Sequence, residues 1–564
     1  MLFDHAESPA ISEYPRPQLR RSVWLSLNGT WEYCITDKKG TPGDWGSILV
    51  PYPPESSRSG VSKVLQPNQI LWYRTDFILE SEDLAGKLLL NFGAVDEEAT
   101  ISVNGHTVGR HSGGYESFSF DITEYCRAGK NVLSLQVNDS TGISGACRGK
   151  QSLKPSGIWY TSMSGIWQTV WLETVPKRYI SHLEISPSVD ENTVTFTVVS
   201  KASSPVTIVT EGHMGMGTSN KPITIKLDNA VLWTPENPKL YSVTVRMGSD
   251  VVESYYALRK CEIKEDRKGN KRLFLNGSPV ITAGVLDQGV WEDTLYTPPG
   301  DHAMVSDIML AKQLGFNTIR KHAKLEPDRW YWHCDRLGMM VWQDIPNGGS
   351  KYSPLVQFAP LLGDLNLRDN LYSMFGRRKP ESRERYLNEL TEIIQQLKNH
   401  PCIVAWVPFN EGWGQFDANK ITETIRALDP DRTIDQASGW HDQGGGDYKS
   451  RHVYFRKYRF KKDEYRRAVI LSEFGGYSLT PEDRKIFSYR KFKNTDELSD
   501  GILGLFRTEI EPAVRRGLAG FVYTQLTDVE TEENGLVTAD RKTIKVKRRE
   551  LQAEIYTICN ILKN

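Results

Sequence analysis

The sequence has no excess of charge of either sign and no long apolar run. Its 70 Lys and Arg residues balance 70 Asp and Glu residues. A neutral total gives no support for nucleic acid or an anionic membrane surface as a partner. No segment reaches the roughly 20 consecutive apolar residues that a membrane-spanning helix requires. We therefore expect neither nucleic acid nor a membrane as a partner.

Closely paired cysteines are also missing. The seven cysteines are odd in number, scattered along the chain and free of any Cys-x-x-Cys motif. This spacing argues against a disulfide framework or a zinc site and indicates reduced thiols. The first residues include Asp4 and Glu7, whereas a secretory signal needs a basic and then an apolar segment there. We therefore expect a cytoplasmic protein.

The first half of the chain is rich in short alternating runs of the kind that form β-strands. Asn104-Gly105 separates two such runs and predicts a tight hairpin, because both residues accept positive φ. Regular strands and turns up to about residue 172 predict a jelly-roll domain over 1–177. A second β-rich stretch, with strands at 193–199 and 241–245, predicts an immunoglobulin-like sandwich over 178–264.

After residue 264 the pattern changes to strands that alternate with helices, which is typical of a parallel sheet. Apolar residues recur at helical spacing over 301–314 and again over 386–397. Strands are predicted at 280–285, 318–320, 339–342, 403–409, 433–435, 453–455, 469–472 and 520–524. Eight strands within 265–564 predict a TIM (β/α)8 barrel, in which Glu411 ends the fourth strand and Glu473 the seventh.

These two glutamates are the strongest candidates for chemistry. Each follows an apolar run of strand length, where an acid has no role in packing. Closing a barrel brings such strand ends together at one mouth. Two facing carboxylates suit cleavage of a glycosidic bond, since one protonates the leaving oxygen and the other attacks or supports the sugar carbon. The alternative is that both form ordinary ion pairs, with Arg320 or Lys321 as partners.

Other polar and aromatic side chains at predicted strand ends are weaker candidates, and each has a structural alternative. His441 and His452 could be ordinary structural histidines, and Trp413 and Trp440 could be packed rim aromatics. The remaining candidates could touch sugar hydroxyls or bond neighbouring loops. The set that we consider for substrate binding is Asp287, Arg320, His322, Asn410, Trp440, His441, Tyr454 and Gln525.

Several short sequence motifs, in the same order along nearly the whole chain, resemble those of glycoside hydrolase family 2. This family includes β-galactosidases, β-glucuronidases and β-mannosidases. They include Trp72-Tyr73-Arg74, Val103-Asn104-Gly105, Ser164-Gly165-Ile166-Trp167, Ile319-Arg320-Lys321-His322 and Asn410-Glu411. The resemblance implies that Glu411 is the acid/base and Glu473 the nucleophile. It also implies that Asn410 donates to the sugar 2-hydroxyl, that Arg320 and His322 line the sugar subsite, and that Tyr454 lies beside the nucleophile.

The chain departs from better-known members of that family in two places. The barrel half lacks the Asn-x-Lys with which β-glucuronidases hold a carboxylate, so glucuronides are disfavoured. Gln343-Asp344-Ile345 stands where large β-galactosidases have a magnesium-ligating Glu-x-His, so we expect no catalytic metal and no cofactor. We also expect no further domain after the predicted barrel, unlike in many relatives.

The resemblance therefore implies a retaining exo-β-glycosidase that acts on a small carbohydrate substrate, with β-galactosides expected first. A β-mannoside, a β-glucoside or a furanoside remains an alternative. A carbohydrate-binding protein without catalysis is a second alternative, although a retained pair of mutually repelling carboxylates argues against it. The sequence leaves open whether the chain forms a homo-oligomer.

Overall fold

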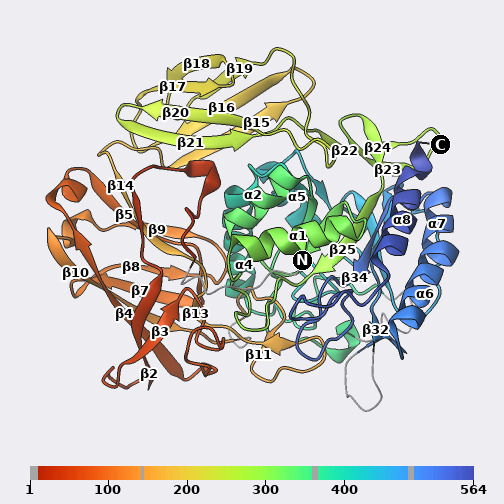
Figure 1. The fold of residues 1–564 in the computed structure, drawn as a ribbon, viewed down its shortest axis with the longest axis horizontal. Helices are drawn as coiled ribbons and strands as arrows, with labels where there is room; N and C mark the ends of the chain where they lie inside the picture. The colour runs from red at the N-terminus through yellow and green to blue at the C-terminus, as the bar shows by residue number, and fades with distance from the viewer. Residues whose placement is uncertain (1–10, 142–144, 358–365, 480–487, 564) are drawn as a thin grey trace.

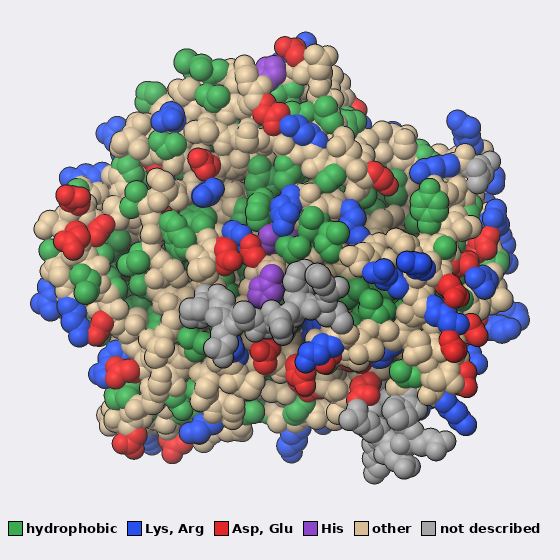
Figure 2. All heavy atoms as spheres, in the orientation of Figure 1, with side chains coloured by type: hydrophobic (Ala, Val, Ile, Leu, Met, Phe, Trp, Pro, Cys, Tyr) green, Lys and Arg blue, Asp and Glu red, His purple; other side chains and the backbone are tan. Residues whose placement is uncertain are grey.

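Two β-sandwiches lie beside a barrel (Figure 1). The computed structural model describes residues 11–141, 145–357, 366–479 and 488–563. Acidic and basic side chains are interspersed over the face shown in Figure 2, in keeping with the zero net charge. No helix within these described ranges is long and apolar enough to cross a membrane.

The first sandwich consists of two antiparallel sheets around a core that includes Trp31, Tyr73 and Phe92. Its six-stranded sheet contains β2 (Gly29–Asp37), β3 (Gly46–Val50), β4 (Gln69–Leu79), β7 (Glu98–Val103), β8 (His106–Ser112) and β10 (Gly129–Asn138). The four-stranded sheet contains β1 (Trp24–Ser26), β5 (Lys87–Phe92), β9 (Phe118–Asp121) and β14 (Val170–Val175). The predicted hairpin is confirmed: Val103 pairs with His106, and Asn104 and Gly105 have φ of 51° and 83°.

The second sandwich is smaller and also antiparallel, as predicted. One sheet holds β15 (His182–Ser188), β16 (Thr193–Val199) and β19 (Pro222–Lys226), and the other β17 (Pro205–Thr210), β18 (His213–Thr218), β20 (Tyr241–Met247) and β21 (Asp250–Tyr256). Leu19, at the end of the short 3-10 helix η1 (Pro17–Leu19), packs in the core of this second sandwich. Helix η1 is therefore packed on the second sandwich, although the predicted boundary places it in the first.

A buried ion-pair network joins the two sandwiches. Arg21 donates to Glu173 of β14 at 2.9 Å and to both oxygens of Asp250 of β21 at 3.0 and 2.9 Å. Burial alone would raise the pKa of Glu173, but Arg16 and Arg21 lower it from 4.5 to about 2. The ionised carboxylate therefore stabilises the fold above pH 4.5, and this contribution is lost as the pH falls from 4.5 toward about 2.

Replacing Arg21 should destabilise the junction strongly. We expect Arg21→Met to lower the free energy of unfolding by about 3–5 kcal/mol, because Asp250 and Glu173 lose a buried partner. Calorimetric melting across pH 3–8 measures this effect. The matched control is Arg20→Met, since the Arg20 side chain is 63% exposed and its ion pair with Glu253 lies at the surface. Equal melting temperatures for the two variants would contradict the assignment.

The barrel is an eight-stranded parallel sheet in the order β29-β28-β27-β26-β25-β34-β31-β30. Its strands are β25 (Thr282–Asp287), β26 (Thr318–Lys321), β27 (Met340–Asp344), β28 (Ile403–Val407), β29 (Thr433–Ile434), β30 (Tyr448–Val453), β31 (Ala468–Gly475) and β34 (Gly520–Thr524). A backbone hydrogen bond from Asp447 to Ile434, 2.8 Å long, bridges the two end strands. The predicted barrel is thus confirmed.

Helices surround the barrel, and apolar faces explain their packing (Figure 1). They are α1 (Asp301–Gln313), α2 (Asp328–Leu337), α4 (Pro380–Leu397), α5 (Ala418–Leu428), α6 (Thr495–Leu505), α7 (Glu511–Arg516) and α8 (Arg548–Cys559). In α4, Leu390, Ile393, Ile394 and Leu397 are buried at helical spacing. This helix begins at Pro380, earlier than the predicted start at 386, because proline suits the first turn.

Three further predictions need correction. The sixth strand is β30, which ends at Val453 instead of spanning 453–455. Glu411 does not end the fourth strand, since β28 stops at Val407 and Pro408 cannot continue the ladder. Glu473 lies within β31 instead of at its end. In addition, β22 (Cys261–Glu265) crosses the predicted boundary at 264 and forms a small sheet with β23 (Lys271–Leu275) and β24 (Ser278–Val280).

Candidate active site

A β-bulge places Glu473 at the barrel mouth. In the pairing of β30 with β31, Arg451 lies opposite Leu471, and His452 lies opposite Glu473. Ser472 is therefore the extra residue of the bulge, and the register shifts at this point. Bulges next to active sites re-aim side chains. Here the shift sets Glu473 directly beside His452, on neighbouring parallel strands.

Glu411 is positioned by a turn after β28. Phe409 and Glu411 are held against the segment after β29, because their backbone groups bond Ser438 at 2.8 and 2.9 Å. Glu411 has a φ of 51°, a left-handed conformation that is uncommon for a non-glycine residue and is typical of functional sites. The indole of Trp440 donates to the Glu411 carbonyl at 3.0 Å and supports the turn from the side.

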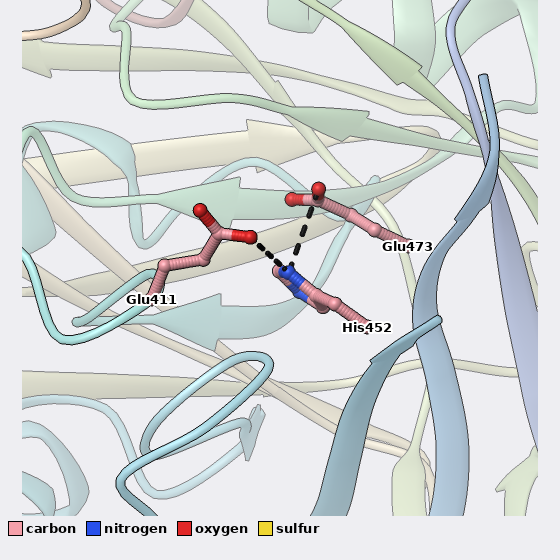
Figure 3. A group of neighbouring side chains, drawn as sticks. All are labelled: Glu411, His452 and Glu473. Carbon is pink, nitrogen blue, oxygen red and sulfur yellow. Dashed lines mark hydrogen bonds and ion pairs between the residues drawn. The ribbon is translucent and has the colours of Figure 1, made fainter. Parts of the chain in front are cut away.

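The two glutamates meet at His452 (Figure 3). Nδ1 of His452 lies 2.8 Å from Oε1 of Glu411 and 3.5 Å from Oε2 of Glu473. One carboxylate oxygen from each glutamate and one histidine nitrogen all lie within 4.8 Å of one another. The side chains of Glu411 and Glu473 are 14% and 6% exposed, so the pair is almost removed from bulk water.

Glu473 is held in its ionised form. Burial on its own would raise the pKa of this carboxyl, but electrostatic interactions with His452 first and then with Arg320 lower it from 4.5 to about 2. Arg320 donates to Oε1 at 3.1 Å, and the Tyr454 hydroxyl donates to Oε2. An ionised carboxylate with directed donors on both oxygens has the properties of a nucleophile.

Arg320 connects the glutamate pair to a fixed charge network. Besides Glu473 it donates to both oxygens of Asp344 at 3.0 Å and to Oδ1 of Asn410 at 2.7 Å. Asp344 also bonds Nδ1 of His322 at 2.6 Å. Burial lowers the pKa of His322 to about 4, although Asp344 opposes this shift. His322 is therefore neutral at physiological pH, and its orientation is fixed by Asp344.

The side chain of Asn410 offers a free donor at the centre of the site. Its carbonyl oxygen accepts from Arg320, and its backbone N–H donates to Asn347 at 3.0 Å. Its Nδ2 is buried and has no hydrogen-bond partner among the described residues. A buried amide without a partner is costly, so a ligand hydroxyl beside Glu411 would satisfy it.

Aromatic rings line the site on two sides. Tyr454 stacks on Tyr489 with ring centroids 3.8 Å apart. On the other side, Trp413 lies 6.1 Å from His322 and 5.3 Å from Trp159, a residue of the first sandwich. Aromatic faces of this kind suit the C–H faces of a sugar ring. The first sandwich therefore contributes to the wall of the barrel mouth.

Three predicted substrate-binding residues are instead engaged by the protein. Asp287 accepts from Lys321 at 2.5 Å and from the Gly289 backbone at 2.9 Å. The Gln525 amide bonds Gln288 and Asn534, and both ring nitrogens of His441 bond backbone groups, of Leu367 and Val356. The structure brings Glu411, Glu473, Asn410, Arg320, His322, Tyr454 and Trp440 together, and it gives these three other partners.

Lys150 was not among the residues considered from the sequence, and His452 was named there only as a weaker candidate with a structural alternative. His452 had a signal in the sequence, because residues two apart on a strand face the same side, and Tyr454 was already a candidate. Lys150 had no such signal. It lies in the first sandwich, and its charge lowers the pKa of both His322 and Glu473. A residue that reaches the site from another domain cannot be identified from the barrel sequence alone.

Two groups of side chains have the spacing of metal ligands within the described residues. One is the Glu411, His452 and Glu473 set itself. The other is Asp96, Glu97 and Asp139 in the first sandwich, all buried. In this second group Asp139 already accepts from Thr141 at 2.7 Å and from Ser164 at 2.6 Å. Acidic groups that accept hydrogen bonds in this way are satisfied without an ion.

The fold and the site define a class of protein: a barrel with two accessory sandwiches and a paired-carboxylate centre at the carboxyl ends of its strands. Three models of one family match the chain in order. They are the sugar-binding domain of glycosyl hydrolases family 2 over 49–176, the family 2 domain over 178–259, and the family 2 TIM barrel domain over 268–475. The chain belongs to glycoside hydrolase family 2.

Individual relatives differ in name. A β-galactosidase from Thermoanaerobacter pseudethanolicus is 28% identical over 393 residues, which cover 64% of this chain and 48% of that protein. A putative β-glucuronidase from Formosa agariphila is 26% identical and matches 71% of this chain and 47% of its own. The chain thus spans about half the length of these relatives.

Solved structures share the whole fold. The β-D-glucuronidase of Dictyoglomus thermophilum has a TM-score of 0.75 at 17% identity and covers 96% of this chain and 98% of its own. A family 2 β-galacturonidase from Eisenbergiella tayi has a TM-score of 0.71 at 19% identity, with 97% and 98% covered. At these identities the likeness concerns the fold.

Proposed function

We propose that this protein is a retaining exo-β-glycosidase that hydrolyses terminal β-linked sugars of the galactose or glucose series. The observation that carries the proposal is the spacing of Glu411 and Glu473, since one carboxylate oxygen of each lies within 4.8 Å of one of the other. Retaining glycosidases place their carboxyls about 5–5.5 Å apart, whereas inverting enzymes need about 6.5–9.5 Å to admit a water molecule.

In the first step, Glu473 attacks the anomeric carbon, and the bond to the leaving oxygen breaks as Glu411 delivers its proton to that oxygen. The sugar is then an ester of Glu473. In the second step, Glu411 removes a proton from water, which attacks the anomeric carbon and releases Glu473. The free Nδ2 of Asn410 suits a donor to the sugar 2-hydroxyl, and the Arg320 guanidinium stays beside the carboxylate that changes charge.

Fewer observations bear on which sugar the protein hydrolyses. Relatives carry both the β-galactosidase and the β-glucuronidase name, so the β-galactoside predicted from the sequence stays a prediction. Contacts such as Trp159 on Trp413 place the first sandwich across one side of the mouth, which supports attack at a chain end. The seven cysteines are unpaired, which supports the reducing, cytoplasmic location that we propose. Assembly into a homo-oligomer also stays a prediction.

A panel of nitrophenyl β-glycosides tests the proposal. We expect release of nitrophenol from at least one hexoside and, by NMR during the first minutes, appearance of the β-anomer of the free sugar before mutarotation. Retention follows because two displacements at one carbon restore its configuration. First appearance of the α-anomer would refute the double displacement. Binding of sugars without turnover of any glycoside would instead indicate a carbohydrate-binding protein.

A further inference from the structure

Lys150 reaches the barrel mouth from a rigidly held loop of the first sandwich. It directly precedes the short strand β11 (Gln151–Ser152), and its carbonyl accepts from the Tyr160 backbone at 2.8 Å. The neighbouring Gly149 donates to the Tyr115 hydroxyl at 2.7 Å. A Cβ at Gly149 would lie only 2.6 Å from the Ala323 carbonyl oxygen, so the loop packs directly on the barrel. Lys150 is therefore held in place before any ligand arrives.

The surroundings of the Lys150 side chain are apolar and aromatic. The residue is 6% exposed, and its ammonium lies 5.6 Å from the centre of the Tyr160 ring and 5.9 Å from that of Trp413. No carboxylate, carbonyl or hydroxyl bonds this ammonium within the part of the chain that the structure describes. Within the described residues its partners are therefore two aromatic rings, and the ammonium lacks an anion.

The catalytic pair lies close to this cation. Trp413 contacts both the Lys150 ammonium, at 5.9 Å, and the His322 ring, at 6.1 Å. His322 is bonded through Asp344 to Arg320, which holds Glu473. The charge of Lys150 also contributes to the lowered pKa of both His322 and Glu473. Contacts through Trp413 therefore link the ammonium to the barrel mouth, and its charge acts on Glu473.

We propose that the Lys150 ammonium binds the carboxylate of a hexuronic acid in the glycone subsite, so that the substrates are β-linked uronides such as β-galacturonides or β-glucuronides. This inference rests on the proposed glycosidase function and names its substrate class. The sequence alone disfavoured glucuronides because the barrel lacks an Asn-x-Lys motif. The inference reverses that expectation, since a cation from another domain takes the place of the missing lysine. An anionic sugar completes the pairing that the protein leaves open.

Lys150 could instead serve only to keep Glu473 ionised. The two roles differ in what they affect. If Lys150 only supports the nucleophile, its removal lowers kcat for every substrate. It also moves the acidic limb of the pH profile of activity. A cation that binds a carboxylate has, beyond that common effect, an effect on uronides, chiefly in KM. A charge-assisted hydrogen bond of this kind corresponds to about a 10- to 100-fold change in kcat/KM.

The experiment compares Lys150→Met, Lys150→Arg and the wild-type protein on nitrophenyl β-galacturonide, β-glucuronide, β-galactoside and β-glucoside. We expect the wild type to prefer a uronide. Lys150→Met should lose about 10- to 100-fold more in kcat/KM on uronides than on the neutral sugars, while Lys150→Arg keeps most of the preference. The matched control is Lys154→Met, since Lys154 lies exposed just after β11, on the other side of that strand from Lys150.

Calorimetric binding of free galacturonate, glucuronate, galactose and glucose to the wild type gives a second readout that needs neither turnover nor a variant. Tighter binding of a uronate supports the inference. Hydrolysis of neutral glycosides at least as fast as uronides, with an equal loss on all substrates in Lys150→Met, would overturn it and leave the glycosidase function standing. Absence of any turnover would instead count against the proposed function, and the binding order would still decide the role of Lys150.

Discussion

Glu473→Gln should reduce kcat by about 10⁴-fold or more on every β-glycoside that the protein hydrolyses, because no glycosyl ester can form without the carboxylate. The fold should persist. Arg320 keeps Asp344 and Asn410 as partners, and an amide fills nearly the same volume. Initial rates with a nitrophenyl substrate, together with melting temperatures, measure both effects. Normal turnover by a folded Glu473→Gln protein would exclude Glu473 as the nucleophile.

Glu411→Gln is the matched comparison, because the two glutamates have different tasks. The kcat of Glu411→Gln should fall about 10²–10⁴-fold on a substrate with a poor leaving group. It should fall only about tenfold on a dinitrophenyl glycoside, because dinitrophenolate departs without proton donation. Azide should then speed release of the glycosyl ester and give a β-glycosyl azide. The same treatment should leave Glu473→Gln inactive. Equal losses of both variants on the activated substrate would contradict the division of roles.

Much of the fold follows from patterns that the sequence displays. Strand β34 (Gly520–Thr524) and strand β16 (Thr193–Val199) coincide with their predicted ranges, because each is a run of β-formers. Asn104-Gly105 makes its hairpin since few other residues accept these angles. The residues of such an element determine its conformation by themselves. These elements could therefore be predicted without knowing which other parts of the chain pack against them.

The site could be predicted only in part, for reasons that are equally physical. Glu411 and Glu473 stand out because an acid after a buried strand is otherwise unfavourable. The bulge at Ser472 is a matter of register between two strands, and a sequence does not show register. Asp287 and Gln525 also sit at strand ends, but Lys321 and Asn534 engage them. Whether a polar group is free for substrate depends on neighbours distant in sequence.

His452 is the residue through which the two glutamates are coupled. Its Nδ1 lies between them, at 2.8 and 3.5 Å, and its Nε2 lies 3.1 Å from the Ser438 hydroxyl. Ser438 in turn bonds the Ser472 hydroxyl at 2.9 Å. The bulged serine therefore helps to orient the ring that holds the acid/base, and His452 acts as a positioning residue for both carboxylates.

Replacing His452 should change both the rate and its pH dependence. Among the neighbours that lower the pKa of Glu473 to about 2, His452 contributes most, so its removal raises that pKa. Protonation of Glu473 then begins at a higher pH, and the acidic limb of kcat/KM moves upward. We expect His452→Gln to lose about 10²-fold at the optimum as well, because Glu411 loses its orienting bond. His182→Gln, on the second sandwich, is the control. A uniform loss at every pH with an unshifted limb would show that His452 supports the architecture alone, whereas a shifted limb requires its electrostatic effect on the nucleophile.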